Sequence, residues 1–415
     1  MGIVSYGDTT RMRKFVRKLA ANKPVTVTLV GGSITWGQGA SDRKKTSWGG
    51  LFFTWINTTY PHANHILVNA AVPGTPSSYM ALCWRFYIPR DPDLIIVEYN
   101  VNDGGDKSND SPMRRAHERL LRSLLSLESK PAVIENVVMR IPEETIPEPR
   151  YKNAGGDDQI GTLAQYYHLP WISTRSLMWA SMYHAEKAKR INYTDWMADR
   201  DHPNDTGHRY IANLLIALVQ RTPATVWAGD EKSLAEPLHL PLYANNFETI
   251  NNTCIVMGEF MKHVTTSKGF EWKNEGTQQK QKYGLIGMQP DAYFHFLLNT
   301  AENIEYNTRG DFSKVSIAYL ASYEHMGMFE VRCISGCRCE NLVVDGHKKE
   351  HNSQLFTAAL DVSKSDSCLL KFRVLNSTSS GAWKVKVAGV ILSPEHDDPS
   401  ASMYFAVEHH GISNE

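Results

Sequence analysis

Over the first 222 residues, short runs of consecutive apolar residues alternate with segments in which apolar residues recur at helical spacing. The runs predict strands at 25–30, 65–74, 92–103 and 132–139, and the periodic segments predict helices at 10–21, 48–60, 77–88, 111–129 and 205–222. Helical and strand-like pieces are expected between residue 139 and residue 176. Strands that are continuously apolar are buried on both faces. The pattern therefore predicts an α/β domain over residues 1–222, with a parallel sheet covered by helices on both faces.

Beyond this domain the pattern changes. Residues 223–245 contain three prolines and no clear period, which predicts a linker. Short β-rich runs follow, separated by turns rich in Gly, Asn, Asp and Ser. These runs are typical of an antiparallel β-sandwich, which we expect over residues 246–396, followed by a C-terminal tail at 397–415.

Charge and hydropathy exclude several classes of partner. The 44 Lys and Arg residues balance the 44 Asp and Glu residues, which gives no electrostatic reason to expect nucleic acid or an anionic membrane surface as a partner. No apolar run approaches the length of a membrane span. The N-terminus shows no apolar core of a signal peptide, and Tyr6 breaks the myristoylation pattern.

The cysteines and the glycosylation motifs favour an oxidising compartment. Five of the six cysteines lie in the second half of the chain, where disulfides that pin loops of the β-sandwich are expected. Zinc ligation is the alternative, which the unusual Cys-x3-Cys-x-Cys spacing at Cys333, Cys337 and Cys339 disfavours. Asn-x-Ser/Thr acceptors stand at Asn57, Asn192, Asn204, Asn251 and Asn376. We expect the secretory pathway or the extracellular space, while the missing signal peptide leaves the cytoplasm open.

Residues that can do chemistry stand where three of the predicted strands end. Ser33 follows the first strand, Gly74 the second and Asn102 the third. Asp199 and His202 lie just before the last predicted helix of the domain. Because the carboxyl ends of parallel strands meet at one edge of a sheet, we expect these residues to converge there.

The segments GGSIT, NAAVPG, YNVND and DRDHPN resemble, in this order, the motifs of the SGNH or GDSL-type hydrolase superfamily. That superfamily is named for a Ser, a Gly, an Asn and a His, with an Asp three residues before the His. The resemblance covers about residues 24–220. It implies a flavodoxin-like, three-layer α/β/α fold and a serine nucleophile that needs neither a cofactor nor a metal ion.

The resemblance also implies roles that suit acyl-transfer chemistry. Ser33 would be the nucleophile, His202 the base that takes its proton, and Asp199 the residue that orients the imidazole. The oxyanion hole would consist of the backbone N–H groups of Ser33 and Gly74 and the side-chain amide of Asn102.

Two positions depart from the pattern of the superfamily. The Asp that usually precedes the serine is Gly32 here, and this Asp is not a member of the triad. The glycine that usually stands two residues before the Asn is Asn100, so either Asn100 or Asn102 could donate to the oxyanion; the pair Asn102-Asp103 favours Asn102. Three carboxylates compete with Asp199 by proximity and are expected to be solvated or to cap helices: Asp195, Asp201 and Asp205.

Further residues near the predicted strand ends could line a sugar pocket: Trp36, Gln38, Tyr79, Arg140 and Arg200. An exposed Trp beside a site suits a carbohydrate ring, but packing in the core is an equal alternative for each of these residues. Four other histidines of this domain are expected to be structural: His65, His168, His184 and His208.

In the second half, residues 315–347 and 379–392 resemble the C-terminal part of SGNH-type proteins that occur in algae and are related to fungal capsule-associated proteins. This resemblance implies a glycan-modifying enzyme of the secretory pathway. The second domain shows no ordered set of nucleophile, base and oxyanion donors, so we expect it to be non-catalytic.

The activity that we expect is that of a carbohydrate esterase that removes acyl groups, foremost acetyl groups, from a carbohydrate or a small ester. One alternative is a polysaccharide O-acetyltransferase that uses the same acyl-serine, which the absence of a transmembrane acyl-donor domain disfavours. The other is a catalytically silent glycan-binding protein, which the complete set of motif residues disfavours. The sequence does not indicate an oligomeric state.

Overall fold

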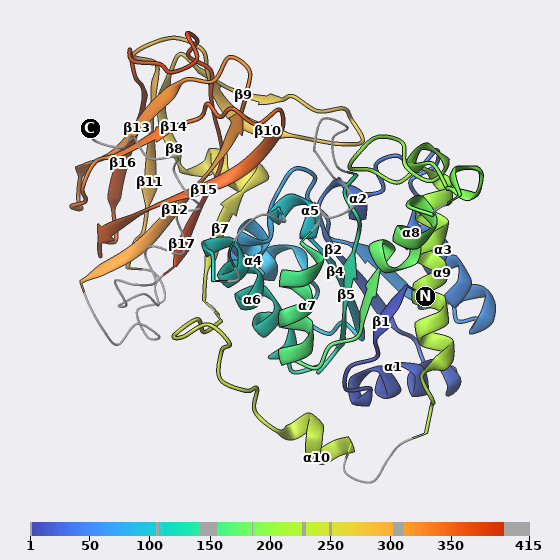
Figure 1. The fold of residues 1–415 in the computed structure, drawn as a ribbon. Helices are drawn as coiled ribbons and strands as arrows, with labels where there is room; N and C mark the ends of the chain where they lie inside the picture. Colours follow the sequence, from blue (N-terminus) through green and yellow to red (C-terminus); the bar gives the residue numbers. More distant parts are fainter. Residues whose placement is uncertain are drawn as a thin grey trace. The chain divides into compact units, whose positions relative to one another are not determined.

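The structure is a computed structural model of the chain, and it describes residues 2–104, 108, 110–141, 156–184, 186–225, 230–248, 251–301 and 311–393. These residues form two compact units (Figure 1). The first unit comprises Met1–Ser77 and Tyr87–Phe247, and the second comprises Ser78–Phe86 and Glu248–Glu415. The expected tail at 397–415 lies outside the described residues.

The first unit is built on a six-stranded sheet with the order β1-β6-β5-β4-β2-β3. Neighbouring strands are parallel, except that β1 pairs antiparallel with β6. The strands are β1 (Ile3–Ser5), β2 (Thr26–Gly31), β3 (Ile66–Asn69), β4 (Leu94–Glu98), β5 (Ala132–Val137) and β6 (Trp171–Ser173).

Without β1, this order is the flavodoxin-like one, in which the winding reverses between β2 and β4 and ligands bind outside the carboxyl ends of the strands at that point. The predicted parallel α/β domain is therefore confirmed. The antiparallel edge strand β1 is an addition, because three residues carry too little pattern to predict a strand.

Helices cover both faces of this sheet (Figure 1). One face packs against α1, α3 and α9 around the buried residues Phe15, Trp48 and Ile211, and α6 and α7 lie on the other face. The helices of this unit are α1 (Thr10–Ala20), α2 (Ser33–Trp36), α3 (Trp48–Thr59), α5 (Asn100–Asp103), α6 (Pro112–Leu125), α7 (Asp157–Tyr166), α8 (Thr174–Met182), α9 (Asp205–Arg221) and α10 (Asp230–Ala235), with 3₁₀ turns η2 (Lys187–Lys189) and η3 (Tyr193–Asp195).

The predicted linker is part of the first unit. From α10 onward, residues 230–247 pack along it: Asp230 forms an ion pair with Arg13 of α1. Farther along, the buried carboxylate of Glu118 in α6 accepts hydrogen bonds from the Leu242 N–H at 2.5 Å and the Asn246 amide at 2.6 Å. This segment is held by backbone and amide donors, which leave no apolar periodicity in the sequence.

The second unit is an antiparallel β-sandwich, as predicted. One sheet has the order β15-β12-β17-β10-β9, with β7 paired to β17, and the other has the order β14-β13-β16-β11-β8. Phe294, Phe296 and Phe372 lie in the core between them. The strands are β7 (Thr253–Val256), β8 (Val264–Lys268), β9 (Phe270–Asn274), β10 (Tyr283–Gly287), β11 (Tyr293–Leu298), β12 (Phe312–Ser322), β13 (Met328–Ser335), β14 (Leu342–Asp345), β15 (Ser353–Ser363), β16 (Cys368–Val374) and β17 (Val385–Ser393), with the 3₁₀ segment η4 (Met257–His263).

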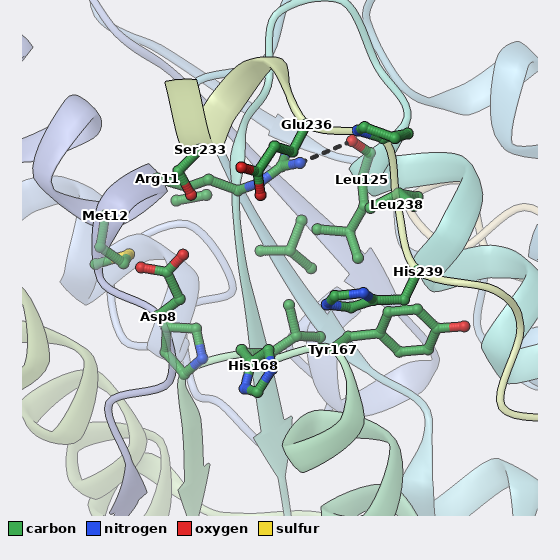
Figure 2. Close-up of a pocket in the computed structure, with 15 residues that line it drawn as sticks. Asp8, Arg11, Met12, Leu125, Tyr167, His168, Ser233, Glu236, Leu238 and His239 are labelled. Atoms are coloured by element: carbon green, nitrogen blue, oxygen red, sulfur yellow. Dashed lines mark hydrogen bonds between the residues drawn. The ribbon is translucent and has the colours of Figure 1, made fainter. Parts of the chain in front are cut away.

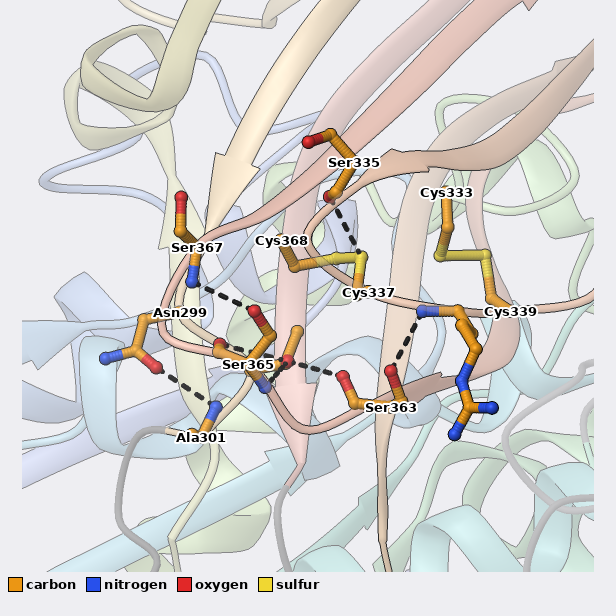
Figure 3. The surroundings of a disulfide bond; sticks show 12 residues. Asn299, Ala301, Cys333, Ser335, Cys337, Cys339, Ser363, Ser365, Ser367 and Cys368 are labelled. Carbon is orange, nitrogen blue, oxygen red and sulfur yellow. Dashed lines mark hydrogen bonds between the residues drawn. A yellow bond between two sulfur atoms is a disulfide. The ribbon is translucent and has the colours of Figure 1, made fainter.

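Three disulfides hold the second unit, and they include all six cysteines. Cys83–Cys254 fastens α4 (Ser77–Tyr87) to β7, which explains why most of this helix belongs to the second unit. Cys333–Cys339 and Cys337–Cys368 lie side by side at the end of β13 (Figure 3). The cysteines are therefore used as disulfides, which are compatible with an extracellular location.

Two of the glycosylation motifs are used within the fold. The Asn204 side chain caps α9 by accepting hydrogen bonds from the Thr206 and Gly207 N–H groups, and Asn192 forms a capping box with Asp195 at η3. These two amides are thus engaged as helix caps. Among the described residues, no helix has both the length and the apolar character of a membrane span.

Candidate active site

The two glycines before Ser33 are required by close packing. A Cβ at Gly32 would overlap with the side-chain amide of Asn102, and a Cβ at Gly31 would overlap with Thr35 and with the backbone carbonyl of Glu98. The chain leaves β2 at Gly31 and turns directly into the short helix α2, which begins at Ser33. The glycines therefore allow the serine to lie beside Asn102 at the carboxyl edge of the sheet.

The structure brings Ser33, His202 and Asp199 together in one line of hydrogen bonds. The Ser33 Oγ lies 2.8 Å from the His202 Nε2, and the His202 Nδ1 lies 2.8 Å from the Asp199 Oδ2. The imidazole is largely buried, with 16% of its side-chain surface exposed. This is the geometry in which an imidazole can take a proton from a serine while a carboxylate stabilises the imidazolium that forms.

Asp199 is held by its own loop. Its Oδ1 accepts hydrogen bonds from the backbone N–H groups of Asp201 at 2.8 Å and of His202 at 2.7 Å, and the Ala198 N–H donates to the His202 carbonyl. Partial burial would raise the pKa of Asp199, but the hydrogen bonds from the His202 ring and the backbone outweigh it and lower the pKa below its ordinary value. The carboxylate that faces His202 is therefore charged at neutral pH.

The competing carboxylates have other partners. Asp201 pairs with the Arg140 guanidinium at 2.6 Å. Asp205, in the first turn of α9, accepts hydrogen bonds from the backbone and hydroxyl of Ser41 and from Thr46. Asp195 closes the capping box at η3. Asp199 is thus the carboxylate of this segment that faces the imidazole.

The candidate oxyanion donors lie in the loops that follow β3 and β4. Gly74 has a backbone φ of +78°, a conformation that favours glycine, and Asn102 lies in α5 beside Gly32. Asn100 is buried, and both polar atoms of its side chain bond to the backbone of Val138, at 2.7 and 3.0 Å. This engagement of Asn100 supports Asn102 as the amide donor.

The five candidate sugar contacts are placed differently. Trp36 is half-buried with the Arg43 guanidinium over its ring, and the Gln38 carbonyl is bonded by His208. Arg140 pairs with Asp201, and the Arg200 guanidinium lies over the Tyr193 ring. Tyr79 is only 4% exposed, in a part of α4 that belongs to the second unit. For Tyr79 this burial supports the packing alternative.

His208 connects three elements of the first unit. Burial lowers its pKa to about 4, so the ring is neutral at physiological pH. Its Nδ1 accepts the Trp48 N–H at 3.3 Å, and its Nε2 therefore carries the proton and donates it to the Gln38 carbonyl at 3.1 Å. The expected structural role of His208 thus takes the form of a bridge between α9, α3 and the loop after α2.

The sequence reasoning missed a buried polar layer beneath these loops. Glu98 ends β4 with its side chain fully buried, and Thr35 donates a hydrogen bond to it at 2.9 Å. His117 in α6 lies between Asp103 and Glu135. A signal was present, because Glu98 and Glu135 each interrupt an otherwise apolar strand run.

A separate cavity of about 130 Å³ lies at the opposite edge of the sheet, where β5 and β6 begin (Figure 2). Arg11, His168 and His239 line it, and the Arg11 guanidinium is bonded to the carbonyls of Leu125 and Pro131. Ser33, Asp199 and His202 are not among the residues that line this cavity.

Comparisons with known proteins agree with the fold. A two-domain esterase active on acetylated mannans is 19% identical, with a TM-score of 0.68, and the match covers 95% of this chain and 98% of that chain. The same esterase co-crystallised with mannopentaose gives the same identity and TM-score and covers 96% of this chain and 98% of that chain. An acetylxylan esterase from Geobacillus stearothermophilus is 20% identical over 47% of this chain and 94% of its own, with a TM-score of 0.35. No curated protein sequence matches this chain.

A protein-family model matches part of the first unit, in which Ser33, His202 and Asp199 lie. The model of the GDSL-like lipase/acylhydrolase family matches residues 29–210, which include Ser33, Gly74, Asn102, Asp199 and His202. This α/β unit is therefore that of a hydrolase of the SGNH/GDSL superfamily, an enzyme that acts on ester bonds.

Proposed function

We propose that this protein is a serine esterase that removes acetyl groups from an acetylated carbohydrate through an acyl-enzyme on Ser33. The observation that carries the proposal is the continuous contact from Ser33 through His202 to Asp199, with both distances at 2.8 Å. A serine hydroxyl is a poor nucleophile at neutral pH and needs an adjacent base of this kind.

In the first half-reaction the Ser33 Oγ attacks the carbonyl carbon of the ester, and its proton passes to the His202 Nε2. The carbonyl oxygen becomes an oxyanion, which the N–H groups of Ser33 and Gly74 and the amide of Asn102 stabilise. The bond to the sugar oxygen then breaks, and His202 returns the proton to this leaving oxygen. The products are the free sugar hydroxyl and acetyl-Ser33.

In the second half-reaction water attacks acetyl-Ser33, and His202 takes a proton from this water. The tetrahedral intermediate collapses, the bond to the Ser33 Oγ breaks, and the proton returns to Ser33. Acetic acid leaves and ionises to acetate in the solvent, and the enzyme is restored. Asp199 stays ionised throughout and stabilises the imidazolium that forms in each half-reaction.

The substrate class rests on the shared fold. The two-domain esterase that matches nearly the whole chain is active on acetylated mannans. We therefore infer an acetylated polysaccharide as the substrate class here. The half-buried Trp36 and the exposed Arg140 near the strand ends are groups that could contact a sugar.

The test measures acetate release from an aryl acetate and from acetylated mannan. We expect Ser33→Ala to remove nearly all turnover, since loss of a triad serine costs about a millionfold. The control is Ser41→Ala, which removes an exposed hydroxyl bonded to Asp205 and should leave turnover near that of the wild type.

An organophosphonate followed by peptide mapping identifies the nucleophile. A label on a residue other than Ser33, or normal turnover in Ser33→Ala, would contradict the proposal. Acetyl transfer to an added acceptor sugar in place of release as acetate would identify an acetyltransferase instead.

A further inference from the structure

Beneath the loops that carry Gly74 and Asn102 lies a row of buried ionisable side chains that the proposed reaction does not use. His117 of α6 is fully buried. Its Nδ1 lies 3.3 Å from the Asp103 Oδ2, and its Nε2 lies 2.8 Å from the Glu135 Oε1. Both carboxylates are at most 2% exposed. The imidazole therefore connects α5 to β5 across the interior.

Asp103 also joins the two oxyanion loops. Its Oδ1 accepts a hydrogen bond from the Ser77 N–H at 2.8 Å. Ser77 follows Gly74 by three residues, and Asp103 directly follows Asn102. One carboxylate thus connects the loop that carries a backbone donor to the loop that carries the amide donor.

The positive charge on His117 offsets the negative charges of Glu135 and Asp103. Burial alone would lower the pKa of His117, but the neighbouring carboxylates of Glu135 and Asp103 raise it to about 9. Glu98 lies near Asp103, and burial raises its pKa to about 8, so it is uncharged at neutral pH. Of the other groups facing this cluster, Tyr99 is neutral and Arg114 of α6 is a second cation.

We propose that Asp103, held by His117 and through it by Glu135, is a positioning residue that sets the spacing between the Gly74 N–H and the Asn102 amide around the oxyanion. This inference rests on the proposed function. Oxyanion donors act only if they are fixed before the charge develops. A clamp between their loops fixes them without touching the substrate.

The first measurement compares how much a substitution at Asp103 changes kcat with how much it changes KM. Asp103→Asn keeps the size of the side chain but removes the charge that His117 faces. We expect kcat for an aryl acetate to fall about ten- to hundredfold with KM nearly unchanged, because a displacement of about 1 Å can cost about a hundredfold in rate. Asn102→Ala, which removes the donor itself, serves as the reference.

The second readout is the pH dependence of kcat. With His117 neutral, the clamp loses its cation, so kcat of the wild type should fall as the pH rises through about 9. Glu135→Gln removes the largest charge that raises the pKa of His117, and should move this alkaline limb to lower pH. His117→Gln should lower kcat and abolish the limb.

The matched control is Glu118→Gln. Glu118 is as buried as His117 and follows it in α6, but its carboxylate faces residues 242–246. We expect this variant to lower the melting temperature while kcat and its alkaline limb stay as in the wild type. Loss of stability alone is thereby separated from loss of positioning.

The results distinguish a failure of the positioning role from a failure of the proposed function. If the wild type turns over through Ser33 but Asp103→Asn and Glu135→Gln keep its kcat and pH profile, the positioning role is wrong and the proposed function stands. A wild type without Ser33-dependent turnover overturns both. Should His117→Gln not fold, the direction in which Glu135→Gln shifts the limb decides the question.

Discussion

The side chains of Ser33 and His202 meet although 169 positions separate them in the chain. Each is presented by a short loop whose own backbone is constrained: glycines on the serine side, and hydrogen bonds to Asp199 on the histidine side. The contact is therefore formed by two local structures that the sheet places at one edge.

At this scale Asp199 and Asp201 can be told apart. Asp199→Ala should lower kcat by about 10³- to 10⁴-fold, less than Ser33→Ala, because the imidazole remains but loses its orientation and its counter-charge. Asp201→Asn should stay within about threefold of the wild type, since exposed ion pairs such as that with Arg140 contribute little. Steady-state kinetics with an aryl acetate measure both; equal losses in the two variants would rule out Asp199 as the specific partner.

The places of Ser33, Gly74, Asn102 and His202 in the fold could be predicted because each follows a strand or precedes a helix that has a clear pattern, while their roles stay a prediction. The role of Asn100 could not, because its two bonds to the Val138 backbone depend on the register between β4 and β5. The contacts of Asp103 with Ser77 and His117 could not be predicted either. Single buried carboxylates are visible in a sequence, but their partners lie on other elements.

Among the elements, the segment after α9 and the helix α4 departed most from expectation. The strong periodic helices and the long strands were predicted correctly as elements. Residues 230–247 were not recognised as part of the first unit, because their contacts run through Glu118 and Arg122 of α6 to backbone groups. The assignment of most of α4 to the second unit depends on a disulfide whose partners are 171 residues apart.

The segment leads to a prediction about where the chain can be cut. A chain ending at residue 247 keeps the donors that bond to Glu118, whereas a chain ending at 240 loses Leu242, Tyr243 and Asn246. Hydrogen bonds to a charged group contribute about 1.5–3 kcal/mol each, so the shorter chain should be less stable by more than ~3 kcal/mol.

Urea unfolding of the two chains, both with Cys83→Ser, measures this difference. We also expect the chain ending at 247 to keep turnover of a small aryl ester, because Ser33, His202 and Asp199 all lie in the first unit. Equal stabilities would show that the segment does not support α6. Complete loss of turnover would mean that the second unit supplies a residue of the site.

For the whole molecule, the buried ionisable groups make stability depend on pH. Folding raises the pKa of Glu98 from 4.5 to about 8 and that of His117 from 6.5 to about 9. Between pH 6.5 and 8 the folded protein therefore holds two protons that the unfolded chain has released. Stability that is fully present below the unfolded pKa of each group is lost as the pH rises through its folded pKa.

We therefore expect the free energy of unfolding to fall from pH 6.5 to pH 8, by about 1.4 kcal/mol per pH unit for each such proton. Chemical denaturation at a series of pH values measures it. Glu98→Gln, which cannot titrate, should reduce the slope. A stability that rises over this range, or a slope that Glu98→Gln leaves unchanged, would contradict the assignment.

The bond between Cys83 and Cys254 has a consequence for how such a protein could arise and be rearranged. The second unit is discontinuous in the chain, because a helix encoded between β3 and β4 is tied to it. Recombination that joined a new C-terminal module after residue 247 would leave this helix with a partnerless thiol. A nascent chain emerging from the ribosome likewise cannot complete the disulfide of its first half until residue 254 has been synthesised.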